Sequence, residues 1–153
     1  MIPIGAVLLV GLGAVLAIGV VKMNAANSEF QRLRASIAPP DGWVLASENT
    51  RLTGLFGTCF TSVLDVRACP SAFDSYAVTS GYSEGKLTDA LESSGVTITM
   101  TDCEEQTGNG RGTFTVCSVA GQRDGHTIKM QVIGTVDSTG VVADPEGRLS
   151  IDR

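Results

Sequence analysis

The residues with the clearest potential for chemistry lie at a junction between a predicted strand and a predicted helix. The stretch GYSEG places Ser83 between two glycines. A serine on such a turn can act as a nucleophile if a histidine accepts its proton and a carboxylate orients that histidine. His126 is the single histidine, and Asp89, Asp102 or Asp124 could be its partner. These residues define one hypothesis, a small hydrolase of the cell envelope.

The G-x-S-x-G pattern resembles the nucleophile turn of α/β-hydrolases, and the letters G-Y-S resemble those of cutinases in that family. The resemblance covers five residues and implies a mostly parallel sheet of strand–helix–strand units of about 30 residues each. Only about 43 residues separate Pro40 from Ser83, and they carry no helical pattern. Serine is also a preferred N-cap, and Glu84 favours the positive end of a helix dipole. We therefore interpret Ser83 as a cap and predict a protein that is not an enzyme.

The composition excludes some classes of ligand. The net charge is −5, without a basic stripe, and aromatic residues make up 5% of the chain, which argues against nucleic acid as a partner. DCEE, Asp102 to Glu105, could hold a hard cation such as calcium, but it is more typical of a solvated strand end. We predict no metal and no cofactor.

An apolar run near the N-terminus predicts a membrane anchor. Residues Ile2 to Val21 contain no charge and no polar side chain. Twenty helical residues span roughly 30 Å, the thickness of a bilayer's hydrocarbon core. A cleaved signal peptide is the alternative, with Ala25 and Ala26 at the cleavage site, but its apolar region is usually only about 7–15 residues long. We predict an anchor over residues 1–22 and the lipid bilayer as a partner.

Small residues form a stripe along this predicted helix. Ala6, Gly13 and Ala17 fall within about 40° of one another at 100° per residue. Such a stripe lets a second helix approach closely. Glycine and alanine are also frequent in membrane helices without any such role. We interpret the stripe as a packing surface for other membrane-protein subunits.

All four cysteines follow the apolar run, at Cys59, Cys69, Cys103 and Cys117. An even number in a small anchored domain is typical of two disulfides in an oxidising compartment, and four cytosolic thiols are the alternative. Four cysteines allow three pairings, of which we favour Cys59–Cys69 and Cys103–Cys117, because local closure suits hairpins.

The charges flanking the apolar run point the other way. Lys22, Arg32 and Arg34 follow it, and the positive-inside rule would place the domain in the cytoplasm. Glu29 lies among these three residues and weakens the bias. We give the cysteines more weight and predict an extracytoplasmic, periplasmic domain.

The remaining sequence divides into three parts. Residues 23–38 predict a juxtamembrane stalk helix, with Phe30, Leu33 and Ile37 on one side. Residues 39–136 predict the folded domain. Residues 137–153 are polar and without aromatics, and we predict a loose C-terminal tail there.

The sequence pattern of residues 39–136 predicts an α+β domain, a small antiparallel sheet with one helix packed on it. Ser83 opens the helix and Gly95 ends it. The predicted strands alternate apolar and polar residues; Val96, Ile98 and Met100 share one face of theirs, and Ile128, Met130 and Val132 point inward from another. The strands are predicted at Trp43–Ser47, Ala72–Ser80, Val96–Cys103, Thr113–Val119 and His126–Gly134.

These observations give a functional expectation without a catalytic centre. We expect a single-pass membrane protein that acts by binding, as an accessory subunit or assembly factor of a larger bacterial membrane complex. The alternatives are the Ser83 hydrolase and a domain that senses a ligand or binds the envelope.

Overall fold

A computed structural model describes residues 4–53, 70–103, 113–136 and 142–152, with side chains from Leu16 onward except those of residues 113 and 114. Two helices and six strands lie in these ranges. In chain order they are α1 (Ile4–Ser36), β1 (Trp43–Arg51), β2 (Ser71–Val78), α2 (Glu84–Ser93), β3 (Thr97–Asp102), β4 (Thr113–Arg123), β5 (His126–Val136) and β6 (Val142–Asp152). The predicted α+β class is confirmed.

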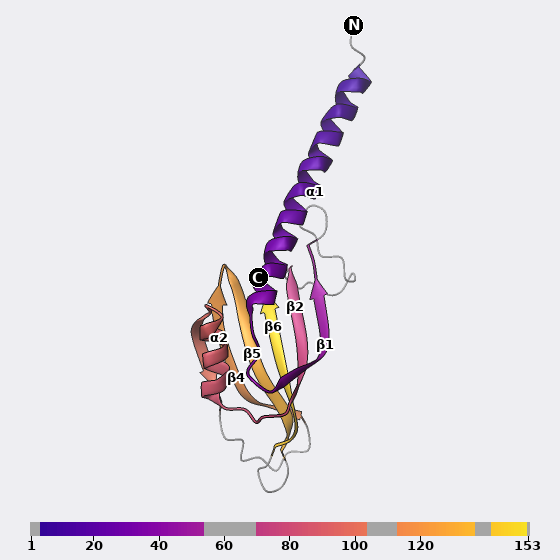
Figure 1. Cartoon of the computed structure of the whole chain (residues 1–153). Helices are drawn as coiled ribbons and strands as arrows, with labels where there is room; N and C mark the ends of the chain where they lie inside the picture. The colour runs from indigo at the N-terminus through magenta and orange to yellow at the C-terminus, as the bar shows by residue number, and fades with distance from the viewer. Residues whose placement is uncertain (1–3, 54–69, 104–112, 137–141, 153) are drawn as a thin grey trace.

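The six strands form one antiparallel sheet in the order β1-β2-β6-β5-β4-β3 (Figure 1). The meander β3-β4-β5 follows the chain, since each strand pairs with the next one. The chain then returns as β6, which lies between β5 and β2. β1 and β3 are the two edges of the sheet.

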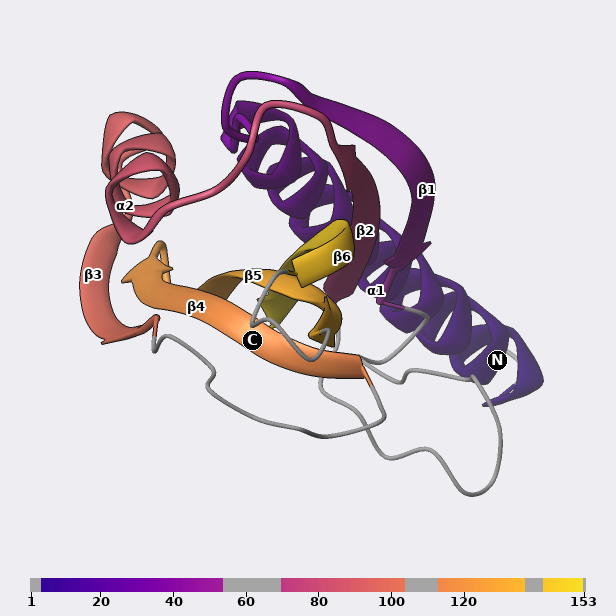
Figure 2. The ribbon, with the colours of Figure 1, turned by 90° about the horizontal axis from the view of Figure 1, so that it is seen from below.

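Both helices cover the same face of the curved sheet, as the view from below shows (Figure 2). The core lies between this face and the helices. It contains buried residues of every strand except β3, with Trp43 from β1, and Ile128, Met130 and Val132 are fully buried as predicted. One core therefore lies under both helices, where the sequence predicted only one helix packed on the sheet.

The helix α2 forms where the sequence predicts it. Ser83 is its N-cap, and its hydroxyl accepts a hydrogen bond of 3.2 Å from the amide of Lys86. Leu87 and Leu91 are fully buried against the sheet. Gly95 has a φ of 74°, a left-handed conformation that glycine adopts without strain, and the chain leaves the helix there.

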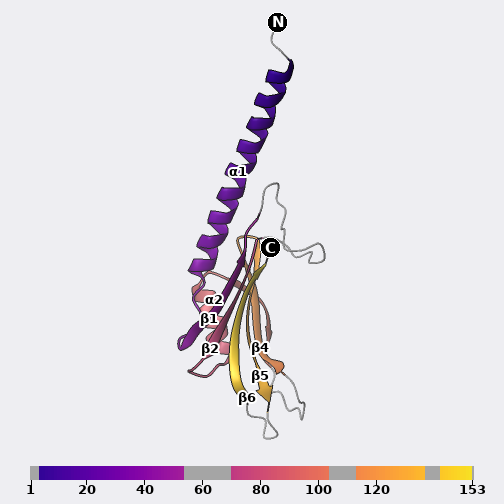
Figure 3. The ribbon, with the colours of Figure 1, turned by 90° about the vertical axis from the view of Figure 1, so that its right-hand side faces the viewer.

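The helix α1 is continuous, but its two ends lie in different surroundings. Its C-terminal end packs on the sheet, whereas its N-terminal half projects beyond the sheet (Figures 1 and 3). We call residues 4–21 the projecting segment and residues 27–37 the docked segment. In the part of the chain with described side chains, where α1 contributes residues 16–36, no helix is long and apolar enough to cross a membrane.

The prediction of a loose tail over residues 137–153 is wrong for residues 142–152. They form β6, an interior strand of the sheet, with Leu149 and Ile151 buried in the core. Gly147 lies under the indole ring of Trp43 so closely that no side chain would fit there. A glycine at position 147 is therefore needed for the packing of Trp43.

One smaller prediction, the burial of Met100, is wrong. The prediction of two disulfides can be checked for one pair only, because the other pair lies outside the described residues. Met100 is 46% exposed, because β3 is an edge strand whose register shifts between Ile98 and Met100. Among the described residues the structure shows one disulfide, the predicted Cys103–Cys117, which ties the end of β3 to β4. Cys59 and Cys69 lie outside the described residues.

Candidate functional site

The docked segment of α1 is part of the domain core. Phe30, Leu33 and Ile37 are 1%, 5% and 5% exposed, and they lie on one side of the helix as predicted. The ring of Phe30 also contacts His126, with 5.6 Å between the ring centroids. The predicted stalk is thus packed into the fold along its last three turns.

A polar cluster fixes this segment to the edge of the sheet. Arg34 of α1 binds Asp74 of β2 through two hydrogen bonds, of 3.1 Å from Nε and 2.6 Å from Nη2. Its Nη1 donates to Thr50 Oγ1 at 2.7 Å, and Nη2 also donates to Glu48 Oε2 at 2.9 Å. We call Arg34, Glu48, Thr50 and Asp74 the Arg34 cluster; it joins one helix and two strands.

The electrostatics of the Arg34 cluster follow from the strand register. Glu48 of β1 lies directly opposite Asp74 of β2, so two carboxylates face each other across the strand pair. Like charges in that position repel, and the guanidinium of Arg34 lies between them. The hydrogen bonds to Asp74, and to a lesser degree Glu48, raise the pKa of Arg34. Burial, followed by the charge of Asp74, raises the pKa of the neighbouring Tyr76.

Two further polar contacts hold the docked segment at its ends. Asn27 exchanges two hydrogen bonds of 2.9 Å with the backbone of Thr53, one to its carbonyl oxygen and one from its amide. At the other end, Nη1 of Arg123 donates to Ser36 Oγ and to the carbonyl of Ser94. The docked segment is therefore fixed on both sides, to the tip of β1 and to the end of α2.

A groove of about 570 Å³ runs between α1 and β1. The Arg34 cluster forms part of its wall, and Leu45 and Leu52 are exposed apolar residues along it. The charged groups at its wall are already paired with one another. Its chemistry is that of a helix-to-strand contact rather than of a prepared ligand site.

The projecting segment exposes the apolar side chains that are described. Leu16, Ile18, Val20 and Val21 are 42%, 57%, 39% and 67% exposed. Ala17 of the predicted packing stripe is exposed as well. Ala6 and Gly13 lie in α1, and their surroundings are outside the described residues.

Ser83 and His126 are not brought together. Ser83 lies at the N-terminal end of α2, whereas Arg123, the pairing partner of His126, contacts Ser94 at its C-terminal end. A helix of ten residues separates these ends by about 15 Å. Nδ1 of His126 lies 3.1 Å from the backbone carbonyl of Asp124, a turn contact. The geometry gives Ser83 a capping role.

The other predicted clusters do not form a site among the described residues. No group of three or more metal-ligating side chains occurs there, and Glu104 and Glu105 lie outside those ranges. Cys117 is 1% exposed and bonded to Cys103, as expected for a structural disulfide.

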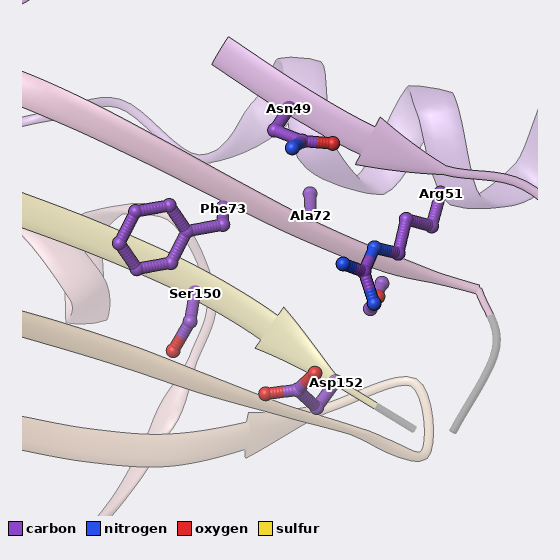
Figure 4. A pocket seen from close by; sticks show the side chains of 7 residues that line it. Asn49, Arg51, Ala72, Phe73, Ser150 and Asp152 are labelled. Carbon is purple, nitrogen blue, oxygen red and sulfur yellow. The ribbon is translucent and has the colours of Figure 1, made fainter. Parts of the chain in front are cut away.

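A shallow pocket of about 240 Å³ opens where β1 and β6 end and β2 begins (Figure 4). Arg51 and Asp152 lie on opposite sides of it, with the ring of Phe73 nearby. The pocket presents both signs of charge and therefore selects no ligand of one charge. Its walls are formed by Asn49, Arg51, Ser71, Ala72, Phe73, Ser150 and Asp152.

Sequence reasoning missed the Arg34 cluster. Asp74 is only 3% exposed although it lies in a strand whose residues alternate in character. The one sign of this burial in the sequence is that Asp74 lies on the same strand face as Tyr76. Arg34 appeared in the sequence analysis only as a basic residue after the apolar run. Finding the Arg34 cluster requires the register of β1 on β2, which the sequence does not specify.

Comparison with known proteins adds no relative to this description. No protein-family model, no curated protein and no solved structure matches the chain.

Proposed function

We propose that the protein is a single-pass membrane-anchored domain that acts by binding, as an accessory subunit or assembly factor of a larger membrane complex. One observation carries the proposal. The apolar N-terminal run continues without a break into a helix whose far end is built into the domain core. Whatever surrounds the projecting segment is therefore coupled directly to the domain.

The exposed apolar residues support a membrane environment for the projecting segment. A Val, Leu or Ile side chain gains about 1.5–3 kcal/mol when it leaves water completely. Leu16, Ile18, Val20 and Val21 have not gained this within the chain. Lipid or a neighbouring apolar helix would provide it, and the uncharged run from Ile2 to Val21 fits both.

We propose the extracytoplasmic side for the domain, and two considerations support this side. The Cys103–Cys117 disulfide fits an oxidising compartment. The opposing positive-inside bias depends on only three residues, Lys22, Arg32 and Arg34.

The stripe of Ala6, Gly13 and Ala17 is the proposed contact with partner subunits. Gly13 and Ala17 are one helical turn apart, so leucine at both positions would prevent close approach of a second helix. The test is purification of full-length protein in mild detergent from its own host, with quantitative mass spectrometry of the co-purifying membrane proteins. The double variant Gly13→Leu/Ala17→Leu should lose stoichiometric partners.

The matched control places the same two side chains on the opposite face. Gly11 and Gly19 each lie about 140° from the stripe centre, and Gly11→Leu/Gly19→Leu should retain the partners. Full assembly of the Gly13→Leu/Ala17→Leu variant would exclude that face as the contact. A wild-type protein that purifies alone would remove the subunit role and leave only the anchored domain.

A further inference from the structure

We infer that the tip of β1, by which we mean Leu52 and Thr53 directly after its last residue Arg51, lies against the headgroup layer of the membrane. The partner is a lipid surface, and the contact follows from the rigid attachment of the sheet to α1. This inference rests on the proposed anchoring of the projecting segment. It adds an interaction surface on the folded domain, separate from the helix face that would contact partner subunits.

The position follows from helix geometry. Asn27 is bonded to both backbone groups of Thr53 and lies six residues after Val21, where the apolar run ends. Six residues advance about 9 Å along a helix axis, and a tilt of about 20° shortens this only slightly. The headgroup layer of one leaflet is roughly 5–7 Å thick. Thr53 is therefore held at the outer boundary of that layer.

The connection between anchor and domain contains no hinge. After Gly19, α1 has no glycine or proline before Pro39. The last three turns are fixed by Phe30 in the core and by the Arg34 cluster at the edge of the sheet. The orientation of the sheet is thus set by the orientation of the helix in the bilayer.

The chemistry of the tip fits this boundary. Leu52 exposes 41% of its surface next to Thr53, where an apolar side chain can enter the interface. Lys22 of α1 is exposed and lies one residue beyond the apolar run, a position at which lysine reaches the headgroups. The opposite end of β1 also carries an exposed apolar residue, Val44, which the same geometry places far from lipid.

The experiment compares the two ends of β1 in the unmodified full-length protein. The protein is placed in phosphatidylcholine nanodiscs, and a small fraction of lipid with a gadolinium chelate on its headgroup is added. Backbone amide relaxation is then measured. Leu52 and Val44 are about 26 Å apart along the strand. Because paramagnetic relaxation falls steeply with distance, we expect an enhancement at least about tenfold greater at Leu52 and Thr53 than at Val44 and Leu45.

Amide exchange in the same sample separates failure of the inference from failure of the anchor. If residues 4–21 are protected from solvent exchange but both ends of β1 relax equally, the anchor stands and the β1 contact is overturned. A larger effect at Val44 would overturn it as well. Rapid exchange along residues 4–21 would instead overturn the proposed function on which the inference rests.

Discussion

The two halves of α1 belong to one helix but meet their surroundings in different ways. The projecting segment is apolar on every face of the helix, and its large apolar side chains, where described, are exposed. The docked segment buries only a narrow stripe and adds polar contacts on both sides of it. Because the helix is continuous, the contacts of the second half fix the rotation of the whole helix relative to the sheet.

This difference shows that apolar and polar contacts contribute differently to the packing of α1 on the sheet. Phe30, Leu33 and Ile37 provide affinity, which is not directional. Arg34 and Asn27 provide position, since their hydrogen bonds form only at one rotation and one height of the helix. Removing contacts of each kind should therefore have different consequences.

The largest expected effect comes from Phe30, which is buried in the core. Phe30→Ala should lower the free energy of unfolding of the domain by about 3–5 kcal/mol, because it removes buried surface and leaves a cavity. The measurement is denaturant unfolding in detergent, followed by the fluorescence of Trp43. Trp43 is buried and should report loss of the core.

Val21→Ala is the matched change in the projecting segment. Val21 is 67% exposed, so its truncation should alter unfolding by less than about 0.5 kcal/mol. Equal losses for the two variants would contradict the division of α1 into two halves. A small loss for Phe30→Ala alone would show that the docked segment contributes little to the core.

A smaller effect is expected from Arg34. Arg34→Ala leaves Asp74 buried and unpaired, with Glu48 opposite it, and should cost about 2–4 kcal/mol of unfolding free energy. The charge of Arg34 also lowers the pKa of Tyr76, and that of Asp74 raises it. The variant should therefore raise the pKa of Tyr76 further, as measured by ultraviolet titration of the phenol.

Arg32→Ala removes the same charge two residues earlier on the same helix. Arg32 is exposed, so the variant should change stability by less than about 0.5 kcal/mol and leave the Tyr76 titration unchanged. A pKa of Tyr76 that does not move in Arg34→Ala would mean that Asp74 finds another cation or takes up a proton.

Local sequence patterns predicted the parts of the fold that depend on local physics. Ser83, the apolar spacing of Leu87 and Leu91, and Gly95 define α2 almost to the residue. The β3-β4-β5 meander and the Cys103–Cys117 pair follow from short connections between alternating strands. Phe30, Leu33 and Ile37 revealed which side of α1 is buried, though not what it packs on.

The parts that depend on distant contacts could not be predicted in this way. β6 contains Pro145 and Gly147 and only two core residues, so its sequence is that of a loop. It becomes a strand because β2 and β5 both offer it hydrogen-bonding partners, and because Trp43 packs over Gly147. The Arg34 cluster likewise depends on strand register, which single-sequence patterns do not encode.

The smallest expected effect concerns Asn27, which sets the height of α1 on the sheet. Asn27→Ala removes both hydrogen bonds to Thr53 and should cost about 1–2 kcal/mol. The loss should be local, so the measurement is hydrogen exchange of the Thr53 amide, whose protection should fall about tenfold, the equivalent of ~1.4 kcal/mol. The protection of the core amides of β5 from hydrogen exchange should not change.

Asn24→Ala is the control, since Asn24 lies almost one turn earlier on α1 and is exposed. It should leave the Thr53 amide unchanged. If neither variant changes the protection of the Thr53 amide, the docked segment begins at Phe30, and the tip of β1 is not bound to the helix. If Asn27→Ala instead unfolds the domain, the polar contacts contribute affinity as well as position, and the distinction between the two kinds of contact fails at this residue.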